Sequence, residues 1–291
     1  QICREKMFRM KKKIWLTKRR ILLIVFGIII FLYSLTMLMP IYYMVVNSIK
    51  RMDDFLENGG WALPKQLYFE NYVNVFKLGG QVSFAAMFFN SVIYTLAAVS
   101  IQTATATMTA YVLSRFQFRG RNFLVALGVG AMFIPNLGSS STIYKLYLDL
   151  GIMDTWFILI QNAGPYGLTF LMIYSLFTTV AKTYTEAAEL DGAREFTIFL
   201  RIVTPMAMGM ICAMMMISGI AAWNDYYTPY MYLPSIKMLS VGLQELALTI
   251  SQFQRPALFA GMVIGIAPVL IVFIVFHDTI IKSTAAGGIK G

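Results

Sequence analysis

The chain has 291 residues, of which 58% are hydrophobic and 13% are charged, against about 25% charged in an average soluble domain. A soluble fold of this length needs a charged surface, so the composition excludes one; the apolar fraction excludes disorder, and two cysteines exclude a disulfide scaffold. The net charge of +10 favours either a nucleic-acid partner or a membrane protein with unevenly distributed charge, and the positions of the charges decide between them.

The chain starts with a basic segment, residues 1–20, and continues with six segments that contain no Asp, Glu, Lys or Arg. Each of the six has at least 21 residues, and about 20 residues of helix cross a bilayer. The sequence therefore predicts an all-α membrane protein with one transmembrane domain, residues 21–281, and a short tail, residues 282–291. The six predicted helices lie near residues 21–46, 83–113, 122–142, 156–180, 203–223 and 257–277.

The basic residues lie mostly on one side of the predicted membrane. The segments on the side of the N-terminus hold 17 of the 24 Lys and Arg residues, which by the positive-inside rule places both termini in the cytoplasm. A role as a membrane-flanking anchor accounts for the basic N-terminal cluster, so we expect contact with lipid and no nucleic-acid partner.

The predicted spans contain no carboxylate, and the single histidine, His277, lies at the end of the last span next to Asp278. An intramembrane enzyme or a proton-coupled transporter needs titratable groups at membrane depth. The sequence therefore predicts no catalytic residue, no metal site and no cofactor bound by this chain.

Neutral polar and aromatic side chains do occur in or beside the spans. They provide either hydrogen bonds between helices or the lining of a path for a neutral, hydroxyl-rich solute such as a sugar. The candidate path residues are Asn90, Tyr94, Gln102, Asn162, Tyr166, Trp223 and Asn224.

One predicted cytoplasmic loop departs from the charge pattern, because residues 182–201 contain four acidic and three basic side chains. The residue pattern predicts a short helix, a turn at Gly192 and a second helix that runs to Pro205. Such a loop suits docking of a cytoplasmic protein, and a solvated turn is the alternative.

The spacing in this loop resembles the E-A-A-x3-G-x9-I-x-L-P signature of binding-protein-dependent ABC importer permeases. The matching residues are Glu186, Ala187, Ala188, Gly192, Ile202 and Pro205, whereas Thr204 replaces the usual leucine. Further segments resemble the carbohydrate branch of that family, in particular the six-span permease subunit of the maltose type, in the same order along the chain. They are Asn90-Ser91, residues 110–121, Trp223-Asn224-Asp225 with Pro229, and the ending at residues 286–291.

The resemblance implies the type I ABC importer permease fold in the bacterial cytoplasmic (inner) membrane. It implies three partners: a second homologous permease subunit, an ATPase dimer that binds ATP and Mg²⁺, and an extracytoplasmic solute-binding protein. By the same resemblance, the ATPase-coupling residues are Glu186, Ala187, Ala188, Glu189, Asp191, Gly192, Ile202 and Pro205. The residues expected near the binding protein are Thr249, Ser251, Gln252, Gln254 and Arg255. By the same resemblance residues 287–291 reach the ATPase, and a frayed tail is the alternative.

The expected substrate is a carbohydrate, most simply an oligosaccharide. Uronate oligosaccharides and glycerol phosphates are alternatives within the family, and Lys50, Arg51, Lys237 and Arg255 would attract an acidic substrate at the outer face. A non-transporting membrane scaffold is the alternative from a different class, but a scaffold would not need the coupling signature.

Overall fold

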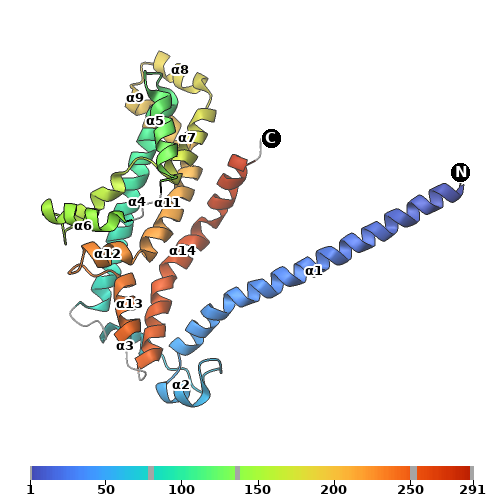
Figure 1. The fold of residues 1–291 in the computed structure, drawn as a ribbon, viewed down its shortest axis with the longest axis vertical. Helices are drawn as coiled ribbons and strands as arrows, with labels where there is room; N and C mark the ends of the chain where they lie inside the picture. The colour runs from blue at the N-terminus through green and yellow to red at the C-terminus, as the bar shows by residue number, and fades with distance from the viewer. Residues whose placement is uncertain (1, 78–81, 135–137, 250–253, 289–291) are drawn as a thin grey trace. The chain divides into compact units, whose positions relative to one another are not determined.

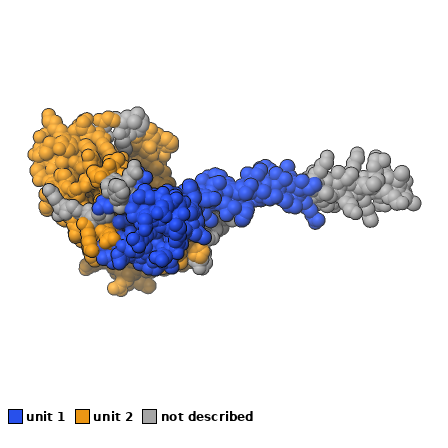
Figure 2. All heavy atoms as spheres, turned by 90° about the horizontal axis from the view of Figure 1, so that it is seen from below, with its two compact units in different colours: residues 1–73, 251–263 blue, residues 74–250, 264–291 orange. Residues whose placement is uncertain are grey.

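The computed structural model describes residues 2–77, 82–134, 138–249 and 254–288, and these residues form helices joined by turns and loops, with no strand among them. They form two compact units, which Figure 2 colours separately. Unit 1 contains residues 1–73 and 251–263, and unit 2 contains residues 74–250 and 264–291. The all-helical class predicted from the sequence is confirmed.

Unit 1 contains α1 (Ile2–Ser48), α2 (Met52–Asn58), most of α3 (Glu70–Asn74) and the first turns of α14 (Arg255–Gly288). The apolar part of α1, Arg20–Ser48, is 29 residues long and therefore long enough to cross a membrane. Every side chain from Arg20 to Tyr42 is exposed, although most of them are apolar. A helix that is apolar on all sides and exposed is suited to a lipid or protein environment.

A buried polar cluster lies at the end of α1 in unit 1. Lys50 is fully buried and donates from Nζ to the carbonyl of Gly59 at 2.8 Å. The carboxylate of Asp54 accepts from the backbone N–H of Lys65 at 2.9 Å and from Asn58 Nδ2 at 2.6 Å. The Lys65 hydrogen bond is the main reason why the pKa of Asp54 is lowered, and burial lowers the pKa of Lys50.

Unit 2 is built around α4 (Phe84–Arg115), which packs along α7 (Leu168–Thr179) and α11 (Met208–Asn224), as Figure 1 shows. The remaining elements of unit 2, besides the rest of α14, are η1 (Val75–Lys77), α5 (Arg121–Ala131), α6 (Ser139–Asp149), η2 (Trp156–Ala163), α8 (Lys182–Leu190), α9 (Glu195–Ile198), η3 (Phe199–Val203), α10 (Thr204–Met206), α12 (Tyr227–Tyr232) and α13 (Leu239–Thr249).

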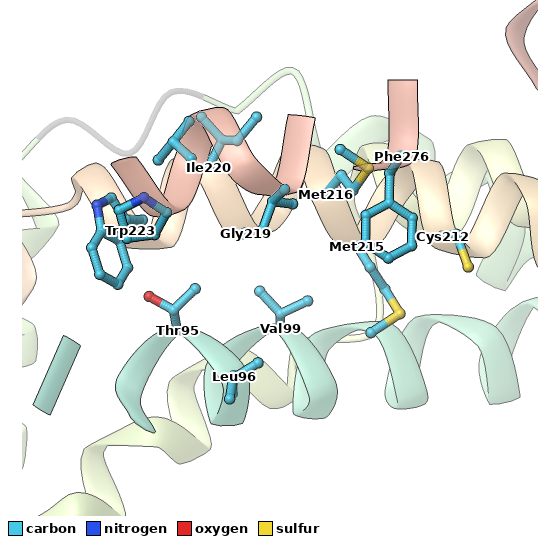
Figure 3. Close-up of a pocket in the computed structure, with 13 residues that line it drawn as sticks. Thr95, Leu96, Val99, Cys212, Met215, Met216, Gly219, Ile220, Trp223 and Phe276 are labelled. Atoms are coloured by element: carbon cyan, nitrogen blue, oxygen red, sulfur yellow. The ribbon is translucent and has the colours of Figure 1, made fainter. Parts of the chain in front are cut away.

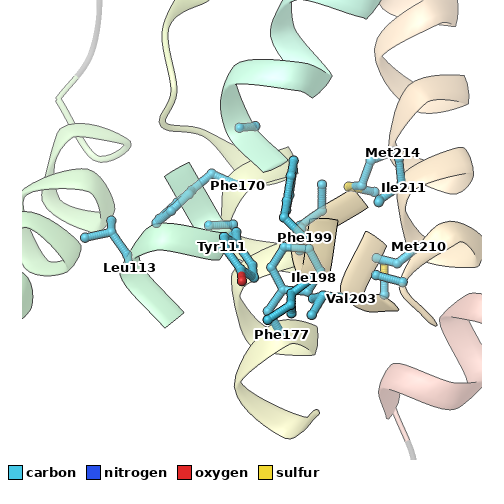
Figure 4. Packing of buried hydrophobic residues seen from close by; sticks show 14 of the residues in the cluster. Tyr111, Leu113, Phe170, Phe177, Ile198, Phe199, Val203, Met210, Ile211 and Met214 are labelled. Atoms are coloured by element: carbon cyan, nitrogen blue, oxygen red, sulfur yellow. The ribbon is translucent and has the colours of Figure 1, made fainter. Parts of the chain in front are cut away.

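Opposite ends of α4 carry different elements. Helices α8 and α9 lie near its C-terminal end, and α12 and α13 lie toward its N-terminal end (Figure 1). At the α8–α9 end, a core of buried side chains includes Tyr111, Phe170, Ile198 and Phe199 (Figure 4). This packing fixes the α8–α9 segment against the long helices.

The described helices provide three to five candidate membrane spans, so six are not established by the helices alone. Three are continuous, in α1, α4 and α14, and two are bent pairs: η2 with α7, at 44°, and Glu195–Met206 with α11, at 78°. Within the predicted third span, α5 ends at Ala131 after 11 residues and α6 begins at Ser139. Glycines at the breaks, Gly138 and Gly167, adopt positive φ angles of 77° and 143°, which continuous helices do not contain.

Candidate functional site

The segment that carries the coupling signature forms two short helices with a tight turn between them. Helix α8 ends at Leu190, and Gly192 adopts a φ of +81°. The N–H of Gly192 donates to the carbonyl of Glu189 at 3.0 Å, and the N–H of Ala193 donates to that of Ala188 at 2.9 Å. This left-handed cap favours glycine, and the helix–turn–helix predicted here from the sequence is present.

The surface of this segment combines exposed acidic and apolar side chains. Glu186, Ala187, Glu189 and Asp191 are exposed, whereas Ala188 is buried and joins the core. Three large apolar or aromatic side chains that the sequence analysis did not single out are also exposed: Tyr184, Leu190, which is 90% exposed, and Phe196. These three residues could have been found from the sequence, because they are apolar or aromatic side chains within a charged loop. Exposed apolar groups gathered in one place mark contact surfaces.

The two remaining signature residues lie beyond α9. Ile202 packs against the core from η3, a π-helical turn in which the N–H of Thr204 donates to the carbonyl of Phe199. Pro205 is exposed and lacks an N–H, so the regular helical hydrogen bond cannot form at this point. The Thr204 hydroxyl, which stands where the signature has leucine, is buried without a hydrogen-bond partner in the described structure.

A polar cavity of about 210 Å³ lies behind α8, and two guanidinium groups line it. Arg115 is paired with Glu189, and Arg121 donates from Nε to the carbonyl of Leu113 at 2.5 Å and from Nη2 to Tyr174 at 3.5 Å. Because both cations already have partners, they serve to hold α4, α5, α7 and α8 together.

A second, largely apolar cavity of about 320 Å³ lies between α4, α11 and residues 268–276 of α14 (Figure 3). Trp223 lines it and donates from Nε1 to the carbonyl of Gly265 at 2.9 Å. The other lining residues shown in Figure 3 include Thr95, Val99, Met215, Met216 and Phe276.

Of the seven candidate path residues, Trp223 alone lines this cavity, and the other six are spread over unit 2. Asn90 donates to the carbonyl of Lys237 at 3.1 Å, Asn162 to that of Leu159 at 3.3 Å, and Asn224 to that of Ile220 at 2.8 Å. Tyr94 is buried in a core cluster, Tyr166 packs on Phe170 with ring centroids 5.2 Å apart, and Gln102 is half-buried. Their polar groups therefore do not converge on one binding pocket in this structure.

The residues expected to face the binding protein lie around the end of α13 and the start of α14. Thr249, Gln254 and Arg255 are exposed, and the Thr249 hydroxyl donates to the carbonyl of Glu245 at 2.7 Å. Ser251 and Gln252 lie outside the described residues, as do residues 289–291 of the predicted C-terminal tail.

Comparison with known proteins identifies relatives over nearly the whole chain, although no family model matches it. The chain is 29% identical over 268 residues to the probable ABC transporter permease protein YurM of Bacillus subtilis (strain 168). The aligned region covers 91% of this chain and 87% of that protein. It is 30% identical over 264 residues to the arabinooligosaccharides transport system permease protein AraQ of the same organism, which covers 89% of this chain and 92% of that protein.

The fold also has a solved counterpart. The crystal structure of a bacterial ABC transporter involved in the import of the acidic polysaccharide alginate contains a chain that matches with a TM-score of 0.79 and 22% identity. The match covers 89% of this chain and 96% of that one, so the ABC importer permease fold is shown for most of the sequence. The relatives are non-enzymatic inner-membrane subunits, and ATP hydrolysis belongs to a partner ATPase. The chain belongs to the family of permease subunits of ABC-type sugar transporters.

Proposed function

We propose that this chain is the membrane subunit through which an ABC importer moves an oligosaccharide across the inner membrane. An external binding protein delivers the sugar, a second homologous permease subunit completes the pathway, and an ATPase dimer that binds ATP and Mg²⁺ drives it. Arabinooligosaccharide transport in the AraQ system supports an oligosaccharide as the substrate class.

The observation that carries this proposal is the exposed surface of α8 and its turn. Leu190 is 90% exposed, and the carboxylates of Glu186 and Asp191 are exposed near it on the same short segment. An apolar side chain with a polar rim is the arrangement of a protein contact surface. The ATPase would cover Leu190, while Glu186 and Asp191 would hydrogen-bond at the edge of the contact.

We assign the α8–α9 end of unit 2 to the cytoplasm. The distribution of basic residues supports this orientation, since the segments on that side hold 17 of 24 Lys and Arg residues. With α1, α4, α14 and the two bent pairs as five spans, the apolar segment that begins with α5 would be the sixth. Six spans place both termini on the cytoplasmic side.

The opposite end of unit 2, at α13, would then face the binding protein. The proposed contact segment runs from Thr249 of unit 2 through Ser251 and Gln252 to Gln254 and Arg255 of unit 1, and of these Thr249, Gln254 and Arg255 are exposed. Within the membrane, Trp223 is a proposed path residue. Since the cavity that it lines is largely apolar, the partner subunit would have to supply the polar groups that a sugar needs.

The pairing of basic residues favours a neutral oligosaccharide over an acidic one. Two of the four cations that would attract an acidic substrate are paired with carboxylates: Arg51 with Asp53 at 3.2 Å and Lys237 with Glu245 at 2.5 Å. Lys50 is fully buried and donates to the carbonyl of Gly59, so it is not available at the surface. A paired cation contributes less to the attraction of a further anion.

Co-purification of the complete transporter tests the assignment of the ATPase surface. We expect the wild-type chain to purify with its cognate ATPase and the Leu190→Asp variant to lose it. Leu248→Asp is the matched control, because Leu248 is also highly exposed but lies on α13, and it should retain the ATPase. A wild-type chain that never binds an ATPase would indicate a membrane scaffold instead.

The substrate is tested on the cognate binding protein by thermal shift with neutral and uronic oligosaccharides. A stabilising shift with neutral oligosaccharides alone is expected. A shift confined to the uronic series would overturn the neutral assignment and leave the permease function intact.

A further inference from the structure

The last turns of α4 carry two side chains that contact the α8–α9 segment on both sides of its turn. Tyr111 donates from its hydroxyl to Glu195 Oε2 at 2.8 Å, and Arg115 Nη2 pairs with Glu189 Oε1. Tyr111 and Arg115 are four residues apart, so they lie on one face of the helix.

The two carboxylates flank the turn at Gly192. Glu189 belongs to the last turn of α8, and Glu195 is the first residue of α9. One contact would allow the α8–α9 segment to rotate about its point of attachment, whereas two contacts on either side of the turn fix its orientation. Gly192 is the point where the backbone would otherwise bend, since a glycine has few steric limits.

The Tyr111–Glu195 contact is part-buried, whereas the Arg115–Glu189 pair is buried on the side of the arginine alone. An ordinary surface ion pair contributes little, so the two contacts are expected to act together. Tyr111 is buried, and its ring packs on two others (Figure 4). The ring centroid of Tyr111 lies 4.9 Å from that of Phe199 and 6.3 Å from that of Phe177. The side chain of Arg115 is 15% exposed, and that of its partner Glu189 is 46% exposed. Partial burial strengthens charge-assisted contacts because water screens them less.

We propose that Tyr111 and Arg115 are positioning residues that hold the α8–α9 segment and α4 as one rigid body. This inference rests on the proposed coupling role of the segment. In a transporter, a displacement imposed on α8 by the ATPase then reaches the membrane part of α4 without being lost at the Gly192 turn. The Tyr111–Glu195 and Arg115–Glu189 contacts together form a clamp. This clamp sets how much sugar is moved for each ATP hydrolysed.

The test is the ratio of sugar transported to ATP hydrolysed by the complete transporter in proteoliposomes. We expect Arg115→Glu to lower this ratio by about fivefold, because the pair is lost and two carboxylates then face each other. The double variant Arg115→Glu with Glu189→Arg restores the pair with reversed charges. It should recover most of the ratio if Glu189 acts by pairing with Arg115 and not by contacting the ATPase directly. Arg119→Glu is the matched control, because Arg119 is exposed in the same basic segment, and it should leave the ratio unchanged.

Tyr111→Phe is a second test, which remains possible if the Arg115→Glu chain does not assemble into a transporter. It keeps the buried ring and removes only the hydroxyl, so the transporter should assemble, with the transport ratio reduced. A ratio equal to wild type in Tyr111→Phe, or a double variant no better than Arg115→Glu, would overturn the clamp.

Failure of the clamp and failure of the proposed function are distinguishable. If wild-type proteoliposomes show ATP-driven uptake and Leu190→Asp loses the ATPase, the coupling role stands whatever the clamp variants show. If the wild-type complex shows no ATP-driven uptake, the proposed function itself is wrong, and the clamp with it.

Discussion

The hydroxyl of Ser91 accepts a hydrogen bond of 2.8 Å from the backbone N–H of Leu239, a residue 148 positions later in the chain. Leu239 is the first residue of α13, where the N–H has no partner within its own helix. Ser91 on α4 therefore supplies the cap of another helix. Together with the Asn90 bond to the carbonyl of Lys237, it fastens α4 to the α13 end of unit 2.

Ser91→Ala should destabilise unit 2, because both residues are buried and the Leu239 N–H would lose its partner. A buried donor left unsatisfied costs about 1–3 kcal/mol. Thermal unfolding of the purified protein in detergent measures the effect, with Ser100→Ala as the control, since Ser100 is exposed on the same helix. Equal melting temperatures for the two variants would show that the capping bond contributes nothing.

Gly192→Val should reduce transport while membrane insertion remains normal. The φ of +81° costs about 1–2 kcal/mol for a residue with a Cβ, and more for a β-branched one. Gly192→Asn is the discriminating control, since asparagine adopts the left-handed conformation readily and should retain most of the activity. If the asparagine variant is as impaired as the valine variant, backbone conformation is not what the turn requires.

Gly128→Ala should destabilise the packing of α5 against Tyr166. A Cβ at this position would lie 2.3 Å from Tyr166 Cδ1, so the ring must move, and overpacking of this kind costs about 1–3 kcal/mol. Gly130→Ala on the same helix meets nothing within 4 Å and should be neutral or stabilising, because alanine favours helix by about 1 kcal/mol. The melting temperatures of the two variants should therefore change in opposite directions or differ clearly.

The polar cluster of unit 1 should loosen in acid. The pKa of Asp54 is lowered in the folded chain, mainly by the hydrogen bond from the Lys65 N–H. The ionised carboxylate therefore contributes fully to the stability of the folded cluster above the ordinary aspartate pKa of 3.8. This contribution is lost as the pH falls through the lower, folded value, because the proton then binds in both states. Hydrogen exchange of residues 50–65 between pH 7 and pH 3 should show this loss.

Asp54→Asn should make exchange in the same segment faster at pH 7, by roughly tenfold, the factor for about 1.4 kcal/mol or one charged hydrogen bond. Asp53→Asn is the control, since the pair of Asp53 with Arg51 is exposed. A similar acceleration in both variants would contradict a specific role for the buried carboxylate.

The sequence predicted where helices occur better than where they break. Segments without charge became helices because backbone polar groups in an apolar environment must bond within their own segment. The breaks follow residues that the charge pattern ignores, such as Gly138 between α5 and α6, and Gly167 between η2 and α7. A glycine in a charge-free run is compatible with a span or with a bend, and only tertiary packing decides between them.

The candidate site was predictable to a similar extent. The spacing around Gly192 predicted the turn between α8 and α9, since a positive φ at that position favours glycine. The contacts of Tyr111 with Glu195 and of Arg115 with Glu189 join residues 84 and 74 positions apart, and no local pattern reports such pairs. For Asn90 the sequence left open a hydrogen bond between helices or a place on a solute path. Its amide donates to the carbonyl of Lys237, a contact that depends on where α13 lies.

The exposed apolar surface of α1 has a consequence for biosynthesis. Apart from the Pro40 nitrogen, this helix can satisfy its backbone within itself, and its side chains from Arg20 to Tyr42 are not buried by the rest of unit 1. It precedes α4, α7 and α11, which pack on one another, as it leaves the ribosome. The nascent chain can therefore be anchored in the bilayer before the mutually dependent helices are made, and those helices meet while already held at the membrane.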